Sequence, residues 1–458
     1  MSNKQSIFKK ITRRIKQESL PDRGLFHYLR EDEHGKIRMH LRIDPCGTGL
    51  LIANANRVVH LNPTAAAMAY LYLEGRTPED AAHLLRKKFS ISNSDALEDF
   101  NNFSIQLEEL ISPNGGCPVC ELSLETTAPF SSMPTAPYRM DLAVTYRCNN
   151  DCDHCYNARP RKFPEMDTQS WKKIIDRIWD LGIPHIVFTG GEPTLYNGLP
   201  DLVAYAEKKG LITGINTNGR KLADQAYLTK LVNAGLDHVQ ITIESHNPQI
   251  HDQMVSAKGA WEETVQGLKH VLKTRLYAMT NTTLLTHNSP SIVQTLDFLA
   301  QLKVPTVGLN ALIYAGKGED VGSGLKETDL PPILENARHI TQSNDQRLIW
   351  YTPTQYCHFN PLQLDLGIKG CTAALYNMCI EPNGDVIPCQ SYYHSLGNLL
   401  EDPWEKIWDH PLAIQLRQRK DIPEGCQGCE FLIECGGGCP LARQHQTIQP
   451  IQNPVFTT

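Results

Sequence analysis

The chain lacks any segment that would carry it into or through a membrane. Its 458 residues contain no run of about 18 apolar side chains, the length that a membrane-spanning helix needs. The basic start, MSNKQSIFKKITRRIKQ, has no apolar signal core. Its apolar residues instead share one face of a predicted helix: Ile7, Phe8, Ile11 and Ile15. This face would dock on the protein itself, on a partner or on an anionic surface. We expect a cytoplasmic protein without a transmembrane segment.

The chain also has no excess of positive charge. Its net charge of −6 gives no general case for binding nucleic acid, so no nucleic-acid partner is expected. A hydrophobic share of 41% and a charged share of 21% are ordinary for globular proteins, so a sizeable core can form. At roughly 150 residues per domain, two to four domains are expected.

Cysteine is too sparse for a small disulfide scaffold, yet it is not scattered. The chain has 14 cysteines, and most of them fall in groups at short spacing. In a reducing compartment such groups indicate metal binding rather than disulfides. The groups are Cys117 and Cys120; Cys148, Cys152 and Cys155; Cys371, Cys379 and Cys389; and Cys426, Cys429, Cys435 and Cys439.

The pattern of predicted elements divides the chain into regions. After a basic segment, 1–35, residues 36–111 predict short strands followed by three helices, a compact α+β domain similar to winged-helix modules. Thr77-Pro78-Glu79 has the capping residue and the first-turn proline of a helix start. Residues 112–137 are rich in Pro, Ser and Thr and predict a linker.

Between residues 138 and 325, predicted strands and helices alternate six times. Such repeats favour parallel strands with crossover helices, in a doubly wound sheet or a barrel. A loop of three cysteines follows the first strand and Gly190-Gly191-Glu192-Pro193 follows the second, so both lie on the face where barrels carry their chemistry. Residues 350–443 predict a small cysteine-rich domain, and the tail, 444–458, has no cysteine.

The stretch YRCNNDCDHCYN holds three cysteines and no fourth. A structural zinc site needs four ligands, and His154 sits beside Cys155, where adjacent residues rarely reach one ion. A four-iron cluster takes one thiolate per iron. Cys148, Cys152 and Cys155 would therefore leave one iron open to a further ligand. The alternatives are a zinc site and core thiols.

This C-x3-C-x2-C spacing after a first strand, with GGEP after the second, resembles the radical S-adenosylmethionine (SAM) family over about residues 138–325. The resemblance implies a partial (β/α)6 barrel of TIM type, in which the open iron of a [4Fe–4S] cluster chelates SAM. It also implies that SAM is cleaved to a 5′-deoxyadenosyl radical that abstracts hydrogen from the substrate. A flavodoxin- or ferredoxin-type partner would donate the electron.

The same resemblance implies which side chains surround SAM. Gly190, Gly191 and Glu192 would hold its ammonium group, because glycine lets the backbone approach a ligand closely. His154 stands where the family often has an aromatic residue near the adenine. Ribose and carboxylate contacts are expected at Asn216, Thr242, Glu244 and Ser245, for which barrel packing is the alternative. The arginine that often follows a His-Asp pair in the family is missing after His251-Asp252.

The later cysteines resemble the SPASM extension of radical SAM enzymes, which carries auxiliary [4Fe–4S] clusters. Cys371, Gly384 and Cys389 have the spacing C-x12-G-x4-C, and the run from Cys426 to Cys439 has the spacing C-x2-C-x5-C-x3-C. The resemblance implies a first auxiliary cluster on Cys371, Cys379, Cys389 and Cys439, and a second on Cys426, Cys429 and Cys435.

The second auxiliary cluster lacks an identified fourth ligand, because no cysteine follows Cys439. Either it is open to substrate, or it is completed by a remote residue, or it is absent. The remote candidates are Cys357, Cys117, Cys120 and His445. The alternative for this run is a zinc ribbon built from its own four cysteines.

The front segment RVVHLNPTAAAMAYLYLEGRTPEDAAHLLRKKF resembles the PqqD-like domains that bind leader segments of ribosomally made precursor peptides. In such domains an extended peptide pairs with an exposed strand edge. The strand from Lys36 to Ile43 or that from Arg57 to Leu61 would offer this edge. The alternative is a winged-helix module that binds DNA or packs on the barrel.

Three functions are consistent with these observations. The first is a radical SAM/SPASM maturase that modifies a ribosomally synthesised peptide or protein by crosslinking, epimerisation or oxidation. The second is a radical SAM enzyme of small-molecule cofactor or haem biosynthesis. The third is a non-enzymatic zinc protein with a regulatory front domain.

Overall fold

The structure is a computed structural model that describes residues 19–32, 35–53, 57–111 and 134–445. Contacts divide it into two compact units. The first extends to Tyr138 and includes the short segments Ile178–His185 and Ala206–Ile212; the second comprises the rest. The predicted N-terminal helix, the pair Cys117 and Cys120, most of the linker, and the tail after residue 445 lie outside the described residues.

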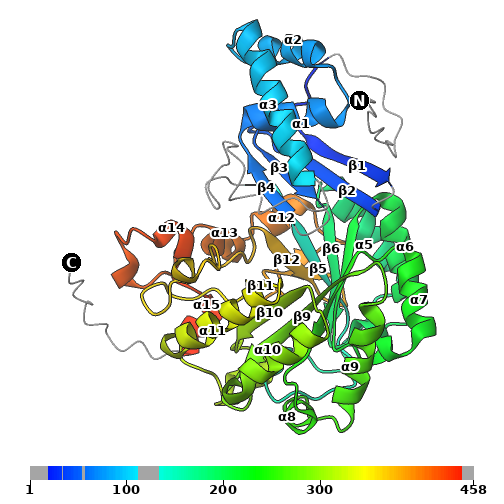
Figure 1. Cartoon of the computed structure of the whole chain (residues 1–458), viewed down its shortest axis with the longest axis vertical. Helices are drawn as coiled ribbons and strands as arrows, with labels where there is room; N and C mark the ends of the chain where they lie inside the picture. Colours follow the sequence, from blue (N-terminus) through cyan, green and yellow to red (C-terminus); the bar gives the residue numbers. More distant parts are fainter. Residues whose placement is uncertain (1–18, 33–34, 54–56, 112–133, 446–458) are drawn as a thin grey trace. The chain divides into compact units, whose positions relative to one another are not determined.

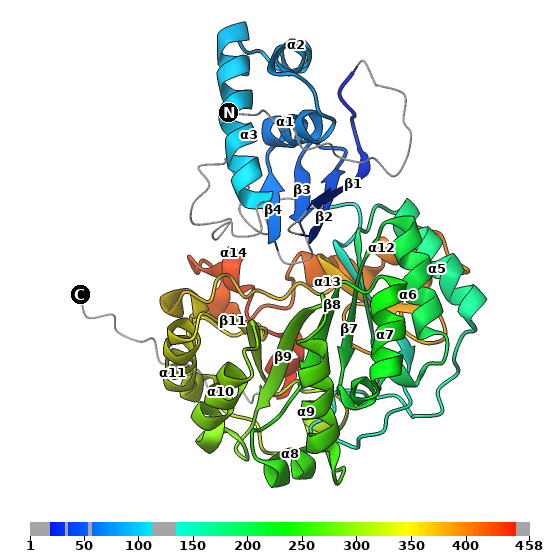
Figure 2. The same cartoon turned by 45° about the vertical axis from the view of Figure 1, so that its right-hand side comes forward.

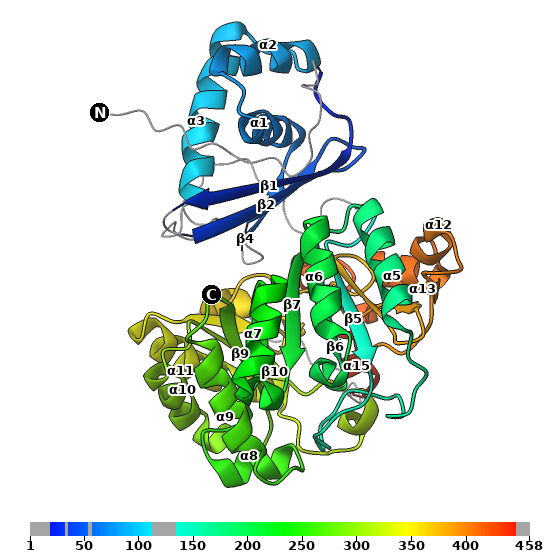
Figure 3. The ribbon, with the colours of Figure 1, turned by 90° about the vertical axis from the view of Figure 1, so that its right-hand side faces the viewer.

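The N-terminal unit contains an antiparallel sheet with three helices on one face (Figures 1 and 3). Its strands pair in chain order: β1 (Gly24–Asp32), β2 (Gly35–Ile43), β3 (Gly49–Ala53) and β4 (Arg57–Leu61). The helices are α1 (Pro63–Leu73), α2 (Pro78–Lys88) and α3 (Asn93–Ile111). The Thr77 side chain accepts a hydrogen bond from the Asp80 N–H, which confirms the predicted start of α2.

Strand β1 was not predicted, because its residues were assigned to the basic segment. An alternating pattern was nevertheless available, since Phe26 and Tyr28 are buried while the residues between and beside them are only partly so. The extra strand changes which edges are free. Because β2 pairs with β1 and with β3, the expectation that Lys36 to Ile43 offers an edge is wrong. Among the described strands β4 pairs with β3 alone.

The second unit is built on a long, largely parallel sheet (Figure 2). All six predicted barrel strands are present and lie side by side in chain order. They are β5 (Arg139–Thr145), β6 (His185–Gly190), β7 (Ile212–Thr217), β8 (His238–Thr242), β9 (Tyr277–Leu284) and β10 (Thr306–Ala311). Strands β5 and β10 do not pair with each other, so the predicted partial barrel of the α/β class is confirmed.

C-terminal strands extend both edges of this sheet. Strand β11 (Arg347–Trp350) lies parallel to β10, and β12 (Asn377–Ile380) lies parallel to β5. Two antiparallel strands follow, β13 (Asp385–Ile387) and β14 (Gly397–Asn398). A cysteine-rich domain was predicted, but not that it shares the barrel sheet, because strands of two to four residues carry almost no periodic signal.

Helices surround the outer face of the parallel strands (Figure 2). They are α5 (Thr168–Asp180), α6 (Leu199–Lys209), α7 (Gln225–Ala234), α8 (Pro248–Met254), α9 (Ala260–Val271), α10 (Ile292–Gln301) and α11 (Leu330–Ser343). The C-terminal region adds α12 (Trp404–Trp408), α13 (Pro411–Arg417), α14 (Leu432–Cys435) and α15 (Pro440–His445). None of the described helices is long and apolar enough to cross a membrane.

Candidate active site

A cavity of about 770 Å³ opens among the carboxyl ends of the parallel strands. Two of the predicted metal-binding groups contribute to its wall. Cys148, Cys152 and Cys155 line it from the loop after β5, and Cys371, Cys389 and Cys439 line it from the cysteine-rich region. The structure therefore brings together thiols that are more than 200 residues apart in the sequence.

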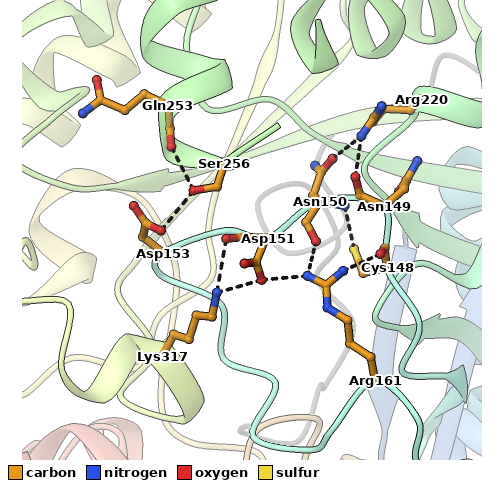
Figure 4. A network of polar contacts seen from close by, with 10 residues as sticks. All are labelled: Cys148, Asn149, Asn150, Asp151, Asp153, Arg161, Arg220, Gln253, Ser256 and Lys317. Carbon is orange, nitrogen blue, oxygen red and sulfur yellow. Dashed lines mark hydrogen bonds and ion pairs between the residues drawn. The ribbon is translucent and has the colours of Figure 1, made fainter. Parts of the chain in front are cut away.

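The backbone of the three-cysteine loop is held by two cations (Figure 4). Arg161 donates to the carbonyl oxygen of Cys148 at 2.6 Å and also to that of Asn150. Its guanidinium group pairs with the Asp151 carboxylate at 2.7 Å, and Lys317 pairs with the same carboxylate at 2.7 Å. These contacts shape the loop through backbone and carboxylate oxygens, so the three thiols remain available for a ligand.

Two further contacts hold the flanks of the loop (Figure 4). Arg220 donates to the carbonyl oxygen of Asn149 at 2.6 Å, and the Ser256 hydroxyl donates to the Asp153 carboxylate at 3.0 Å. Arg220 follows β7 and Ser256 follows α8, so both contacts come from distant parts of the chain. The loop is thus preorganised by its neighbours rather than by its own short sequence.

Burial acts on the acidity of these thiols. It raises the pKa of Cys148 to about 11, and it also raises the pKa of Cys152 and of Cys155. Such thiols lose their protons when a metal cation stabilises the thiolate. Among the described residues, no three His, Cys, Asp or Glu side chains converge on a single ion. A four-iron cluster takes each thiolate on a different iron, so the donor set fits a cluster with one open iron.

Glycine is required at positions 190 and 191 by the neighbouring strand. A Cβ on Gly190, whose φ is +131°, would lie 2.0 Å from the carbonyl oxygen of Thr145. A Cβ on Gly191 would lie 2.5 Å from the carbonyl oxygens of Tyr146 and Arg147. Both glycines line the cavity. Glycine is therefore needed here because the backbone at the end of β5 passes very close to both residues. The sequence analysis had instead attributed these glycines to contact with SAM.

Glu192 does not line the cavity. Its buried carboxylate accepts hydrogen bonds from the Thr194 hydroxyl at 2.6 Å, the Thr217 hydroxyl at 2.7 Å and the Asn218 N–H at 2.8 Å. Burial raises its pKa, although these donors favour the charged form. The carboxylate ties the loop after β6 to the loop after β7, while its contact with SAM remains a prediction.

Two residues predicted to contact SAM form a hydrogen bond with each other. His154 Nε2 lies 2.9 Å from Glu244 Oε1, and the other carboxylate oxygen of Glu244 accepts from the Thr283 N–H at 2.9 Å. Burial lowers the pKa of His154, but the Glu244 carboxylate outweighs this effect and the pKa is raised. Both residues line the cavity, as do Asn216 and Thr242.

Ser245 and the His251-Asp252 pair lie behind this wall. The Ser245 hydroxyl accepts from the Asn247 N–H at 3.1 Å, and Ser245 is not part of the cavity lining. His251 Nδ1 accepts from the Glu244 N–H at 3.1 Å. The Asp252 carboxylate accepts from two backbone N–H groups of the following turn, at 2.6 and 2.8 Å. His251 therefore supports the backbone of Glu244, and Asp252 supports the backbone at the start of α9.

The first predicted auxiliary group lies only partly on the cavity wall. Burial raises the pKa of Cys371 and of Cys389 to about 12, and the thiols of Cys371, Cys389 and Cys439 lie close enough for their charges to interact. Cys379 is 1% exposed and packs in a small apolar cluster with Ala143 of β5. Its thiol still interacts with that of Cys389. The predicted ligand set thus shares one neighbourhood.

The sequence analysis missed an ion pair that joins the three-cysteine loop to the cysteine-rich region. Arg159 pairs with both carboxylate oxygens of Glu381, at 2.6 and 2.8 Å. Tyr146 donates to the same carboxylate at 3.1 Å, and the guanidinium lies over the Tyr393 ring at 5.3 Å. The two ion-pair partners are 222 residues apart, so no local pattern marks them.

Amide side chains that the sequence analysis did not single out form another part of the wall. Asn281, Asn310 and Gln390 line the cavity, and the carbonyl oxygen of each is buried without a hydrogen-bond partner among the described residues. Asn310 is 7% exposed, and its nitrogen donates to the Ala311 carbonyl oxygen at 2.9 Å. This part of the wall is therefore polar but carries no charge.

All the Arg and Lys side chains that line the cavity are already paired with carboxylates. The pairs are Arg139 with Asp141, Arg159 with Glu381, and Arg161 and Lys317 with Asp151. Every cationic side chain on this wall therefore already has an anionic partner, and a ligand with several carboxylates would have to compete for it.

Two family models match parts of the chain. Residues 142–299 match the Radical SAM superfamily, and residues 371–430 match SPASM, an iron–sulfur cluster-binding domain. These matches confirm the predicted cofactor classes: a [4Fe–4S] cluster with SAM in the first region, and iron–sulfur cluster binding in the second.

Two curated relatives match about two thirds of the chain. The chain is 29% identical to the Fe-coproporphyrin III synthase of Methanosarcina barkeri (strain Fusaro / DSM 804), over 64% of this chain and 81% of that protein. It is 26% identical to the mycofactocin maturase MftC of Mycolicibacterium smegmatis (strain ATCC 700084 / mc(2)155), over 70% of this chain and 82% of that protein.

A solved structure shares the fold over most of the chain. The structure of Streptococcus suis SuiB bound to the precursor peptide SuiA has a TM-score of 0.65. The match is 16% identical in sequence and covers 89% of this chain and 95% of that chain.

Proposed function

We propose that this chain, a radical SAM enzyme with a SPASM iron–sulfur domain, modifies a ribosomally synthesised peptide or protein by crosslinking, epimerisation or oxidation. The observation that carries the proposal is the amide-lined wall of the cavity, with its paired cations. The precursor peptide bound to SuiB and the name of the mycofactocin maturase support the same class of substrate.

The polar groups of the wall match the groups of a peptide backbone. The amide side chains of Asn281, Asn310 and Gln390 line the cavity and carry no charge. A peptide backbone is likewise polar and uncharged, with an N–H donor at nearly every residue, so it would enter this cavity without bringing charge into it.

A small molecule of the haem pathway is the second candidate, favoured by the 29% identity to the Fe-coproporphyrin III synthase. Coproporphyrin carries several carboxylates, and burying each of them calls for a cation or several donors. In the described wall the guanidinium and ammonium groups are already held by Asp141, Asp151 and Glu381. The charge distribution thus supports the peptide over the porphyrin.

The N-terminal unit would recruit the substrate. Strand β4 pairs with β3 alone among the described strands, so its other edge can accept an extended peptide through backbone hydrogen bonds. This edge agrees with the proposed PqqD-like role of the unit. A flavodoxin or ferredoxin would serve as the electron donor, and the reduced thiols that clusters need favour a cytoplasmic location.

Different residues of the site would bind the different cofactors. Bound SAM supplies the 5′-deoxyadenosyl radical that removes a hydrogen atom from the substrate. Cys148, Cys152 and Cys155 would hold the cluster that binds SAM, while Cys371, Cys379, Cys389 and Cys439 would hold an auxiliary cluster. The SAM contacts would come from His154, Gly190, Gly191, Asn216, Thr242 and Glu244 on the cavity wall, and Glu192 and Ser245 would position that wall.

The proposal is tested by co-expressing this chain with a candidate precursor peptide and analysing the peptide by mass spectrometry and chiral amino-acid analysis. We expect a loss of hydrogen atoms or an inverted residue that depends on the three cysteines of the loop. In a parallel reaction, tetrapyrrole precursors replace the peptide and the formation of Fe-coproporphyrin III is measured. Formation of this porphyrin, with the peptide unchanged, would overturn the proposal.

A matched pair of variants tests the amide wall itself. Asn310→Ala removes an amide that lines the cavity, and Asn344→Ala removes an amide at the exposed carboxyl end of α11. Because a hydrogen bond contributes about 0.5–1.5 kcal/mol, we expect a roughly two- to tenfold lower kcat/KM for the peptide in the first variant only. Substrate-free formation of 5′-deoxyadenosine should be the same in both. Equal kcat/KM values would show that this amide does not contact the substrate.

A further inference from the structure

The last run of cysteines divides into two parts, because three of its members lie away from the cavity and the fourth lies on the cavity wall. Cys426, Cys429 and Cys435 do not line the cavity, whereas Cys439, four residues beyond Cys435, lies on its wall with Cys371. Because Cys439 interacts with the other group, the trio needs a different partner if it is to hold a closed cluster.

A turn that precedes the cysteine-rich strands lies directly against the trio. The Tyr356 N–H points at Cys435 Sγ at 3.4 Å, and the same sulfur lies 3.6 Å from the carbonyl oxygen of Thr354. The rings of Tyr356 and Phe431 lie 6.2 Å apart, measured between centroids. Residues on both sides of position 357 are therefore in contact with the loop that carries Cys435.

Cys357 lies within this contact. It directly follows Tyr356, whose N–H lies against Cys435 Sγ, and the Cys429 N–H donates to the carbonyl oxygen of Cys426 at 3.2 Å within one turn. The four cysteines thus lie on two contacting segments about 70 residues apart. A set of four thiols, one for each iron, is the donor set of a closed [4Fe–4S] cluster.

The turn is fixed independently of any metal. The N–H groups of His358 and Phe359 donate to the carbonyl oxygen of Gln355, at 2.8 and 2.9 Å. Glu327 receives the Gln355 N–H at 3.1 Å and lies 3.1 Å from His358 Nδ1. These bonds hold residues 355–359 in a compact turn, so the position of Cys357 is preorganised.

We propose that Cys357 is the fourth ligand of an auxiliary [4Fe–4S] cluster held by Cys426, Cys429 and Cys435. This cluster is then closed, with no iron left for substrate, and each thiol gives up its proton to the solvent as its iron binds. The inference rests on the SPASM assignment and not on the peptide substrate. The other described candidate, His445, stacks on Tyr314 of the cavity wall at 5.5 Å.

The test uses the full chain with Cys148, Cys152 and Cys155 replaced by alanine, so that only the SPASM clusters contribute to the signal. Cys357→Ala is then compared with Cys46→Ala, which removes an exposed cysteine of the N-terminal unit. After anaerobic reconstitution, iron, sulfide and zinc are measured and the reduced protein is examined by electron paramagnetic resonance. We expect Cys357→Ala to lose one cluster, about four irons per chain, or to change one resonance signal.

A conservative variant separates ligation from folding. Cys357→Ser retains an oxygen ligand of similar size, so it should keep the iron but shift the resonance of one cluster, an effect that a merely structural cysteine would not produce. Unchanged iron content and resonance in both variants would overturn the proposal. So would zinc at this site, or loss of the cluster in Cys117→Ala/Cys120→Ala with none in Cys357→Ala. None of these readouts depends on the substrate.

Discussion

Two loops of this chain each carry three cysteines, and they differ in what lies beside them. The loop from Cys148 to Cys155 borders a cavity of about 770 Å³ and is held by Arg161 and Lys317 through oxygen atoms alone. The loop from Cys426 to Cys435 lies off the cavity, against a turn that holds Cys357. Both loops carry three thiols. A cavity lies beside the first loop, whereas the segment that carries a fourth cysteine lies beside the second.

In the proposed assignment, the first loop would hold the cluster that binds SAM and the second loop would hold a closed cluster. The spacing of cysteines sets how many irons a loop can hold. Whether the remaining iron is open depends on the neighbouring segment, which supplies either a ligand or a cavity.

The largest effects should follow from removing each set of three thiols. With alanine at Cys148, Cys152 and Cys155, formation of 5′-deoxyadenosine should fall to the level of the uncatalysed reaction, because no iron remains to bind SAM. With alanine at Cys426, Cys429 and Cys435, its formation should persist while about four irons are lost. Liquid chromatography and iron analysis measure both. Equal loss of SAM cleavage in the two variants would refute the division of roles.

A smaller but still large effect is expected from crowding the first loop. Gly191→Ala places a Cβ within 2.5 Å of two carbonyl oxygens at the base of the three-cysteine loop. The resulting overpacking should cost about 1–3 kcal/mol and lower the thermal unfolding midpoint. Gly425→Ala is the matched control beside the second loop, since a Cβ there meets no atom within 4 Å. Similar midpoints for the two variants would contradict the close packing described here.

Removing the cation that shapes the first loop should have a moderate effect. Arg161→Gln leaves the loop carbonyl oxygens of Cys148 and Asn150 without their charged donor. Loss of such supporting contacts typically weakens a metal site 10- to 100-fold, so we expect about tenfold weaker SAM binding in calorimetry. Arg338→Gln, which breaks only an ion pair with the exposed Asp365, should bind SAM like the parent chain.

The last effect concerns pH, which acts on the stability of the barrel rather than on a cluster. Burial lowers the pKa of His238 to about 3, with its ring against Gly214 of the next strand. The folded state therefore excludes a proton that the unfolded state binds below pH about 6.5. Stability is full above that pH and falls by at most about 1.4 kcal/mol per unit as the pH drops towards 3.

The variant His238→Asn should flatten this acid-dependent decrease in the unfolding midpoint. His287→Asn, at an exposed position on the loop after β9, should leave it unchanged. An equal slope in all three proteins between pH 6.5 and 5 would mean that another group controls the acid sensitivity.

Much of the fold was predictable from local patterns. The six barrel strands, the start of α2 at Thr77 and the placement of two motif loops at one end of the sheet all follow from periodicity and turn residues. The strands β1, β11 and β12 were missed, since they were assigned to other regions or are too short for a periodic signal. The role of Gly191 was predicted only in part, because the backbone that it approaches belongs to another strand.

By itself the sequence determined the chemistry: the identity and spacing of ten cysteines and the loops that present them. These are local properties, because neighbouring residues on a loop stay close in any fold. Only the tertiary structure decided which thiols meet, which wall of the cavity carries amides, and how Arg159 reaches Glu381. Those contacts join residues far apart in the chain, and their positions are fixed by packing over the whole sheet rather than by any short pattern.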